Sequence, residues 1–196
     1  MARITLRDPA TMTPRERELY DLFPINLVRA MLVADPDVTE AFLRQGNALQ
    51  NSALSPPLRE LTILRVAALT GCDYERHHHE PRAKQVGASD KDIVAATTGD
   101  LSALDPTQAA LLRYAEECVT KRKASVESFE AARAALGDNG VAIATMLIGH
   151  YVLNAIFAES LEVDTDQQPP DWSSADKKDQ SPAGEAAPGR RVNPSS

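Results

Sequence analysis

Residues 59–81 read RELTILRVAALTGCDYERHHHEP, and this stretch decides the fold. Gly71 is the residue type expected just past a helix end, where the chain needs a left-handed conformation. Asp73 is then expected to cap a second helix through its side-chain oxygen. Apolar residues recur at helical spacing before the break, which predicts a buried face on the first helix: Leu61, Leu64, Ala68 and Leu69.

The second helix carries the titratable groups. Glu75 and His79 are four residues apart and therefore share one face, with Cys72 one turn back on that face. Glu60 lies near the start of the first helix, so antiparallel packing would bring it level with the later part of the second. A carboxylate beside an imidazole can orient its tautomer and raise its basicity. The spacing equally allows an ordinary surface pair of Glu75 and His79, worth roughly 0.3 kcal/mol.

The motif formed by Glu60, a spacer and Cys72-Asp-Tyr-Glu75-Arg-His-His-His79 resembles the core motif of the carboxymuconolactone decarboxylase and alkyl hydroperoxidase D superfamily. Members with peroxidase activity read Glu, a spacer and Cys-x-x-Cys-x-x-x-His, and Glu75 stands here where the second cysteine would be. The resemblance extends over roughly residues 20–163, a length that fits one compact domain.

The resemblance implies an all-α fold, a compact orthogonal helical bundle of about seven or eight helices. It implies assembly as a homotrimer or hexamer, and it makes Glu60, Glu75, His79 and Cys72 the candidate catalytic residues. We expect chemistry without a cofactor, because two carboxylates and an imidazole suffice for acid–base catalysis.

Cys72 has two interpretations. A thiol at a helix N-terminus has a lowered pKa, but Asp73 and Glu75 are adjacent and act in the opposite direction. In peroxidase members the cysteine nearer the histidine attacks the peroxide, and this chain keeps only the other one. A two-cysteine cycle is thus excluded unless another thiol takes part, and Cys118 is predicted to be a core residue on a different helix.

Three further residues are candidates for substrate binding: Tyr74, Arg76 and His150. Arg76, like Arg65, could hold a substrate carboxylate in a bidentate manner, and a solvated or salt-bridged arginine is the alternative. The run of three histidines at 77–79 invites a metal site, but consecutive helical residues point about 100° apart and cannot share one ion. We expect no metal.

The bulk composition limits the function. The net charge of −7 argues against a nucleic-acid partner, and two cysteines cannot form a disulfide framework. With no secretory segment and no apolar run long enough to span a bilayer, we expect a cytoplasmic protein without a membrane partner.

The chain is predicted to divide into a flexible N-terminal arm (1–12), a carboxymuconolactone decarboxylase-like domain (13–163) and a disordered tail (164–196). The last helix, from Gly140 to about Val163, is apolar nearly all round and should be central or buried in an oligomer interface. The tail is too polar to order itself, and its Trp172 is expected to be exposed.

The first functional hypothesis is an enzyme that decarboxylates or isomerises a small organic acid, lactone or carbonyl compound. The alternatives are a single-cysteine, peroxiredoxin-type peroxidase or oxidoreductase acting through Cys72, and a non-catalytic oligomeric scaffold or ligand-binding protein.

Overall fold

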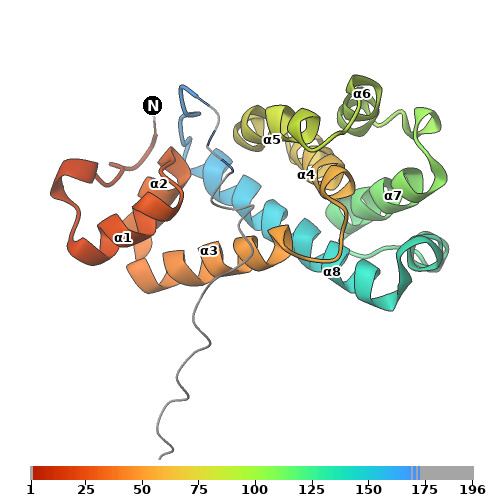
Figure 1. Ribbon diagram of the computed structural model, residues 1–196, viewed down its shortest axis with the longest axis horizontal. Helices are drawn as coiled ribbons and strands as arrows, with labels where there is room; N and C mark the ends of the chain where they lie inside the picture. The colour runs from red at the N-terminus through yellow and green to blue at the C-terminus, as the bar shows by residue number, and fades with distance from the viewer. Residues whose placement is uncertain (1, 169, 171, 173–196) are drawn as a thin grey trace, which may run out of the picture.

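The computed structural model describes residues 2–168, 170 and 172, and within them the fold is all-α (Figure 1). This confirms the predicted fold class. The described residues contain eight α-helices and two short 3-10 helices, η1 and η2, joined by loops. In chain order they are η1 Pro9–Thr11, α1 Pro14–Leu22, α2 Asn26–Ala34, α3 Pro36–Gln50, α4 Pro56–Thr70, α5 Asp73–Gln85, α6 Asp90–Thr98, η2 Leu101–Ala103, α7 Pro106–Lys121 and α8 Val126–Ser160.

Helices α4 and α8 form the centre of the bundle. Helix α4 packs against α5, α6, α7 and α8, and α8 also contacts α3, α5 and α7. Figure 1 shows α1 to α3 on one side of this centre and α5 to α7 on the other. An unbroken run from Leu58 to Ala67 is buried, including its charged residues. The helix that carries Glu60 is therefore an interior element, and its polar groups must find partners inside the protein.

The helix boundaries follow local capping chemistry. Thr13 and Asp105 each form a complete capping box, and Asp35, Ser89 and Ser125 cap through their side chains. Gly71 adopts the predicted left-handed conformation, with φ of 69°.

The predicted cap at Asp73 is wrong. Cys72 takes the cap position without a side-chain hydrogen bond, and Asp73 is the first helical residue, paired with Arg76 at 2.8 Å.

Helix α8 bends at Gly137, whose φ of 71° and ψ of 173° interrupt the helical conformation. By length and composition α8 could cross a membrane, contrary to the expectation that no apolar run is long enough. Half of its most apolar window is buried inside the domain, as in the core helix of a soluble bundle.

Both segments that flank the bundle contact it. In the N-terminal arm (1–12), which was expected to be flexible, Ile4 and Leu6 pack against the hydrophobic cluster that includes the buried residues of α2. The Arg3 N–H also donates to the Leu161 carbonyl at 2.8 Å. At the other end, residues 164–168 lie along the domain and Trp172 is only 9% exposed, so the expected exposure of Trp172 is wrong. The remainder of the predicted disordered tail lies outside the described residues.

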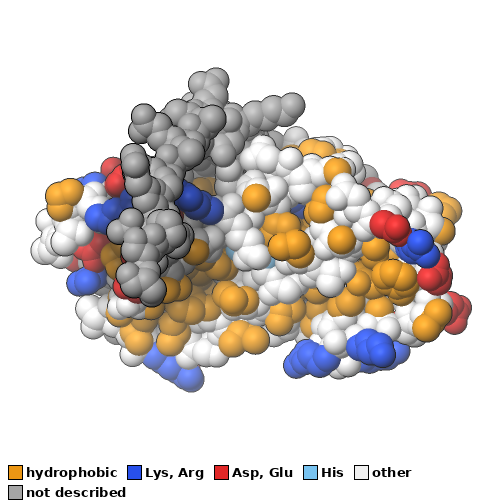
Figure 2. Space-filling view, turned by 90° about the horizontal axis from the view of Figure 1, so that it is seen from below, with side chains coloured by type: hydrophobic (Ala, Val, Ile, Leu, Met, Phe, Trp, Pro, Cys, Tyr) orange, Lys and Arg blue, Asp and Glu red, His pale blue; other side chains and the backbone are white. Residues whose placement is uncertain are grey.

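Several large apolar side chains remain at the surface. Figure 2 shows hydrophobic side chains gathered over one face of the molecule. On α8, Met146, Leu153 and Ile156 are each more than half exposed, and their spacing places them on one side of the helix. We name these three residues the α8 stripe.

Candidate active site

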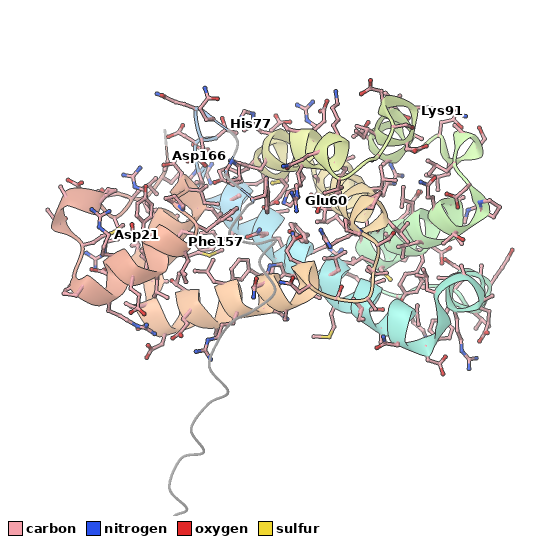
Figure 3. The ribbon with its side chains drawn as sticks, viewed as in Figure 1. Asp21, Glu60, His77, Lys91, Phe157 and Asp166 are labelled. Atoms are coloured by element: carbon pink, nitrogen blue, oxygen red, sulfur yellow. The ribbon has the colours of Figure 1, made fainter. Side chains whose placement is uncertain are left out.

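His79 lies between two carboxylates from different helices. Its Nδ1 donates to Glu60 Oε2 at 2.7 Å, and its Nε2 donates to Glu75 Oε2 at 3.2 Å. All three side chains are at most 4% exposed. Glu60 lies in the interior of the bundle, on α4 (Figure 3). The structure thus brings together three of the four predicted catalytic residues in one buried chain of hydrogen bonds.

The tight reversal at Gly71 makes this geometry possible, because it lays α5 back against α4. Glu75 and His79 then meet through their i,i+4 spacing, while Glu60 reaches His79 from the neighbouring helix. Arg59 binds the other oxygen of the Glu60 carboxylate: its Nε donates to Glu60 Oε1 at 3.2 Å. Arg59 Nη1 in turn donates to the Gln50 carbonyl, which fixes the guanidinium in the interior.

The two carboxylates control the charge of His79. Burial alone would lower the pKa of the imidazole, but Glu60 and Glu75 outweigh this effect and raise the pKa to about 9. At neutral pH the ring is therefore an imidazolium that donates from both nitrogens. Within the described part of the chain, Glu75 Oε1 is buried without a hydrogen-bond partner. That oxygen is therefore the atom of this hydrogen-bonded chain that can accept a hydrogen bond or a proton from a bound molecule.

Helix α8 supplies one wall. The Tyr151 ring stands edge-on to His79 with 5.1 Å between ring centroids, and burial raises the pKa of its hydroxyl well above the usual value. His150 stacks on Phe42 at 4.2 Å and lies 3.0 Å from Gln45 Oε1. Burial and the charge of His79 lower the pKa of His150 to about 4, although Glu75 acts in the opposite direction. His150 is thus a neutral wall residue next to the site.

Trp172 covers the site from the other side. Its ring centroid lies 5.0 Å from that of His79 and 5.1 Å from that of Phe23, and the Arg82 guanidinium lies 5.5 Å from the indole centroid. The sequence offered one signal for this contact, since Trp172 is the only tryptophan of the chain and stands in an otherwise polar segment.

The histidine run holds the segment that leads to Trp172. His77 Nε2 donates to the Asp166 carbonyl at 3.0 Å, and His78 Nε2 lies 3.1 Å from Asp166 Oδ2. The Tyr74 hydroxyl donates to the same carboxylate at 2.7 Å. Burial alone would raise the pKa of Asp166, but these hydrogen bonds and one from the Asn26 N–H lower it.

Tyr74 therefore holds this segment through its hydroxyl, and its role in substrate binding stays a prediction. Among the described residues no group of three or more His, Cys, Asp or Glu side chains is arranged so that it could hold a metal ion.

Cys72 is not part of this arrangement. It is 1% exposed in the apolar cluster around α2, and burial is the main cause that raises the pKa of its thiol to about 12. A thiol in this environment is protonated at neutral pH and is a poor nucleophile. Cys118, half-buried on α7, also has a raised pKa because of burial, in line with a packing role.

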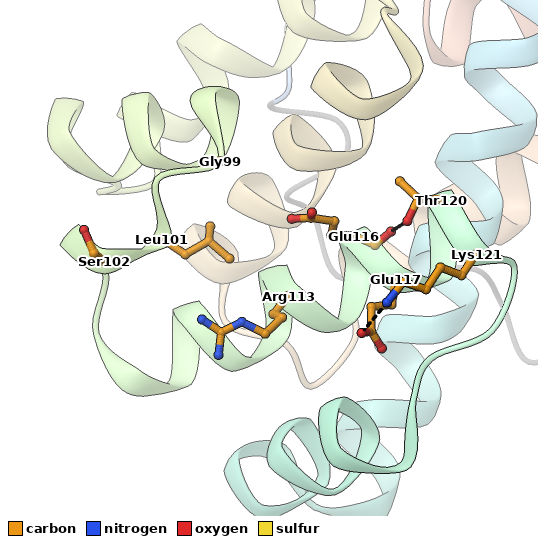
Figure 4. A pocket seen from close by; sticks show the side chains of 8 residues that line it. All are labelled: Gly99, Leu101, Ser102, Arg113, Glu116, Glu117, Thr120 and Lys121. Atoms are coloured by element: carbon orange, nitrogen blue, oxygen red, sulfur yellow. Dashed lines mark hydrogen bonds and ion pairs between the residues drawn. The ribbon is translucent and has the colours of Figure 1, made fainter.

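Both candidate arginines are paired with a carboxylate. Arg76 is exposed and paired with Asp73, and Arg65 is buried against Glu116 at 2.7 Å. Two surface cavities of about 330 Å³ each lie outside the Glu60–His79–Glu75 cluster, and Cys72 and Arg76 are among the residues that line the second one. One of them, between η2 and α7, has a polar lining that includes Arg113 (Figure 4).

Comparison with known proteins agrees with the geometry. Residues 36–117, which include Glu60, Glu75 and His79, match the model of the carboxymuconolactone decarboxylase family. No curated protein sequence matches the chain.

Similar folds occur among solved structures. An uncharacterized peroxidase-related protein with an alkylhydroperoxidase AhpD core, from Ralstonia eutropha JMP134, has a TM-score of 0.73 at 20% identity and covers 85% of this chain and 93% of its own. A peroxidase-related protein from Silicibacter sp. TM1040 gives 0.72 at 17% identity, covering 85% and 92%. The debrominase Bmp8, solved with 2,3,4-tribromopyrrole, gives 0.67 at 12% identity, covering 85% and 91%.

With its motif, its fold and its family segment in agreement, residues 36–117 of the chain resemble the carboxymuconolactone decarboxylase family, and the bundle has the fold of the alkylhydroperoxidase AhpD-core proteins.

Proposed function

We propose that the protein is a cofactor-free acid–base enzyme that decarboxylates or isomerises a small organic acid, lactone or related carbonyl compound. The observation that carries this proposal is the buried chain Glu60–His79–Glu75, which ends in a Glu75 carboxylate oxygen that has no hydrogen-bond partner among the described residues. A general base needs such an oxygen within reach of a substrate proton.

The residues have separate roles in this mechanism. Glu75 Oε1 removes a proton from the carbon next to a carbonyl, and the electron pair of the C–H bond moves into the carbonyl as an enolate. Where the enolate is conjugated with a C=C bond, return of that proton to the far carbon of the conjugated system completes an isomerisation. In a decarboxylation, the electrons of the breaking C–C bond form the enolate as CO₂ leaves, and Glu75 carrying a proton on Oε1 gives it to the carbon and is protonated again from solvent. Glu60 and Arg59 keep His79 oriented.

Deuterium exchange tests the proposal before a substrate is known. Small β-keto acids, lactones and ketones are incubated with the protein in D₂O, and loss of the α-proton signal is followed by NMR. We expect catalysed exchange for at least one compound, and a fall of roughly 10²- to 10⁴-fold in Glu75→Gln because the base is lost.

Glu80→Gln is the matched control, since Glu80 lies on the same helix and its carboxylate is solvent-accessible near Lys84. It should exchange at the wild-type rate. Equal rates in the wild type and in Glu75→Gln would refute the proposal.

The peroxidase alternative finds less support. Peroxide attack needs a thiolate, and the Cys72 thiol is buried with a pKa of about 12. The scaffold alternative does not account for a charged imidazole placed between two buried carboxylates, since burying charges opposes folding.

For the assembly we propose a homotrimer or hexamer. The α8 stripe supports it, because exposed apolar side chains on one side of a helix are typical of a subunit contact.

A further inference from the structure

We infer that Asn154 is a further substrate-binding residue of the acid–base site, and that the site takes an uncharged carbonyl compound with a hydroxyl group on the carbon that loses its proton. The inference deepens the proposed function and rests on it. Glu75 removes the proton from that carbon, while the amide oxygen of Asn154 accepts a hydrogen bond from the hydroxyl.

Two contacts fix how α5 lies along α8. At one end, the Cys72 thiol lies beside the Glu159 carboxylate: burial is the largest cause of the raised pKa of Cys72, and a hydrogen bond to Glu159 adds to it. At the other end, the His79 ring stands edge-on to Tyr151 with 5.1 Å between ring centroids. The part of α5 between these contacts therefore runs antiparallel to residues 151–159 of α8.

This register places Asn154 opposite Glu75. Burial and the charge of Glu75 are the two largest causes of the raised pKa of Tyr151, so the Glu75 carboxylate faces α8. Between Tyr151 and Glu159, the side chains of α8 that are buried are those of Asn154, Ala155 and Ala158. Asn154 is the polar one of the three, one turn beyond Tyr151 on the same face.

Both residues present an acceptor oxygen that lacks a donor. Glu75 Oε1 and Asn154 Oδ1 are buried without a hydrogen-bond partner in the part of the chain that the structure describes. Trp172, which also contacts the His79 ring, supplies neither oxygen with its indole N–H, because Nε1 is unpartnered there as well. A buried acceptor left unpaired opposes folding. A ligand that brings the missing donor is therefore favoured over an analogue that lacks it.

The two acceptors differ in basicity, and this difference assigns their roles. The Glu75 carboxylate can take a proton from carbon. The amide oxygen of Asn154 is a neutral acceptor, so it binds an O–H group that keeps its proton. The hydrogen-bonded chain has two cations, Arg59 and the His79 imidazolium, against its two carboxylates, so its charges are balanced. These features favour an uncharged α-hydroxy ketone or aldehyde.

The chemical step is proton exchange at carbon. Glu75 Oε1 takes the proton from the carbon that bears the hydroxyl, and the electron pair of the C–H bond moves into the carbonyl to give an enediolate. The hydroxyl keeps its proton and donates it to Asn154 Oδ1. In D₂O the proton on Glu75 exchanges with solvent, and return of a deuteron to the same carbon gives the labelled starting compound.

Exchange of three small ketones by the full-length wild type gives the first test. Hydroxyacetone carries the hydroxyl, methoxyacetone keeps the oxygen without its O–H, and butanone has a methyl group in its place. NMR in D₂O follows the proton signal of that carbon, and each rate is divided by the rate in buffer alone. On this scale hydroxyacetone should exchange roughly tenfold or more faster than the other two. Equal rates for the three compounds would overturn the assigned substrate class.

Asn154→Leu gives the second test, since leucine is of similar size and has no acceptor. The variant should lower the rate for hydroxyacetone to that for butanone and leave the rates for butanone and methoxyacetone unchanged. Ligand-observed NMR should show that the variant also loses the tighter binding of hydroxyacetone. A purely structural role of Asn154, such as a direct bond to Glu75, would lower all three rates together. That result, or a variant that exchanges hydroxyacetone as fast as the wild type, overturns the inference.

The two proposals fail in different ways. If Glu75→Gln stops exchange but the three ketones exchange equally in the wild type, the acid–base function stands and the role of Asn154 is wrong. If Glu75→Gln leaves exchange unchanged, while hydroxyacetone binds more tightly than butanone and Asn154→Leu removes that preference, the hydroxyl site is real and the acid–base function is wrong.

Discussion

At the scale of single residues, His79 and His150 respond to the same buried carboxylate with opposite shifts. Glu75 is in direct contact with His79, and with Glu60 it raises the pKa of that ring to about 9. The same Glu75 acts on His150 from a greater distance, where burial prevails and the pKa falls to about 4. One imidazole is therefore held charged and the other neutral inside a single site.

The free energy of unfolding should consequently fall both as pH rises above 6.5 and as pH falls below 6.5. His79 binds its proton more tightly in the folded state, so its contribution is complete below pH 6.5 and is lost as pH rises towards 9. His150 binds its proton more weakly in the folded state, so stability rises with pH between about 4 and 6.5. Each slope has an upper limit of about 1.4 kcal/mol per pH unit.

Urea unfolding from pH 4 to 9 measures these slopes. His79→Gln should abolish the decline above pH 6.5, and it should make the acid-side slope smaller because the charge of His79 no longer lowers the pKa of His150. His150→Gln should abolish the acid-side slope. A decline above pH 6.5 that persists in His79→Gln would show that the ring is neutral in the folded protein.

Among the elements, α8 contains two glycines with opposite requirements. Gly137 has φ of 71° and ψ of 173°, a conformation almost restricted to glycine, and it makes the bend. Gly149 lies in the regular part of the helix, with open space around the position of a Cβ atom. Gly137→Ala should lower the free energy of unfolding by about 1–3 kcal/mol because of backbone strain. Gly149→Ala should raise it by up to about 1 kcal/mol through helix propensity.

Chemical denaturation of the two variants side by side checks this prediction. If Gly137→Ala proves as stable as the wild type, the bend does not exist in solution.

The elements also show what could be predicted from the sequence. The α4–α5 reversal, the caps at Ser89 and Asp105, and the pairing of Glu75 with His79 follow from local rules that act over a few residues. The contact of Trp172 with His79 joins residues 93 positions apart, and no local rule encodes such a contact. The partners of Tyr74 and Arg76 could not be predicted for a related reason, because a polar residue beside a motif does not show which way its helix faces.

For the molecule as a whole, the α8 stripe should set the oligomeric state. Burying an unpaired lysine at a subunit contact costs about 3 kcal/mol or more, which weakens association by roughly a hundredfold. Leu153→Lys combined with Ile156→Lys should thus convert the oligomer into monomers of unchanged helical content. Light scattering after size-exclusion chromatography gives the mass, and circular dichroism gives the helicity.

Val94→Lys is the control for this pair, since Val94 is a similarly exposed residue on α6, away from the stripe. It should leave the mass unchanged. A wild-type protein that is already monomeric would refute the proposed assembly, and a double variant that keeps its full assembly would place the subunit contact elsewhere.

The hydrogen bond between the Asn26 N–H and Asp166 also has a consequence for biosynthesis. It joins residues 140 positions apart, and Arg3 meets Leu161 in the same region. While the ribosome is still translating the middle of the message, the early helices lack these partners. The start of the chain therefore lacks these contacts until residue 166 has been translated, and slow closure of such distant contacts is expected. A nascent chain halted before residue 166 should therefore expose its first helices to chaperones and proteases.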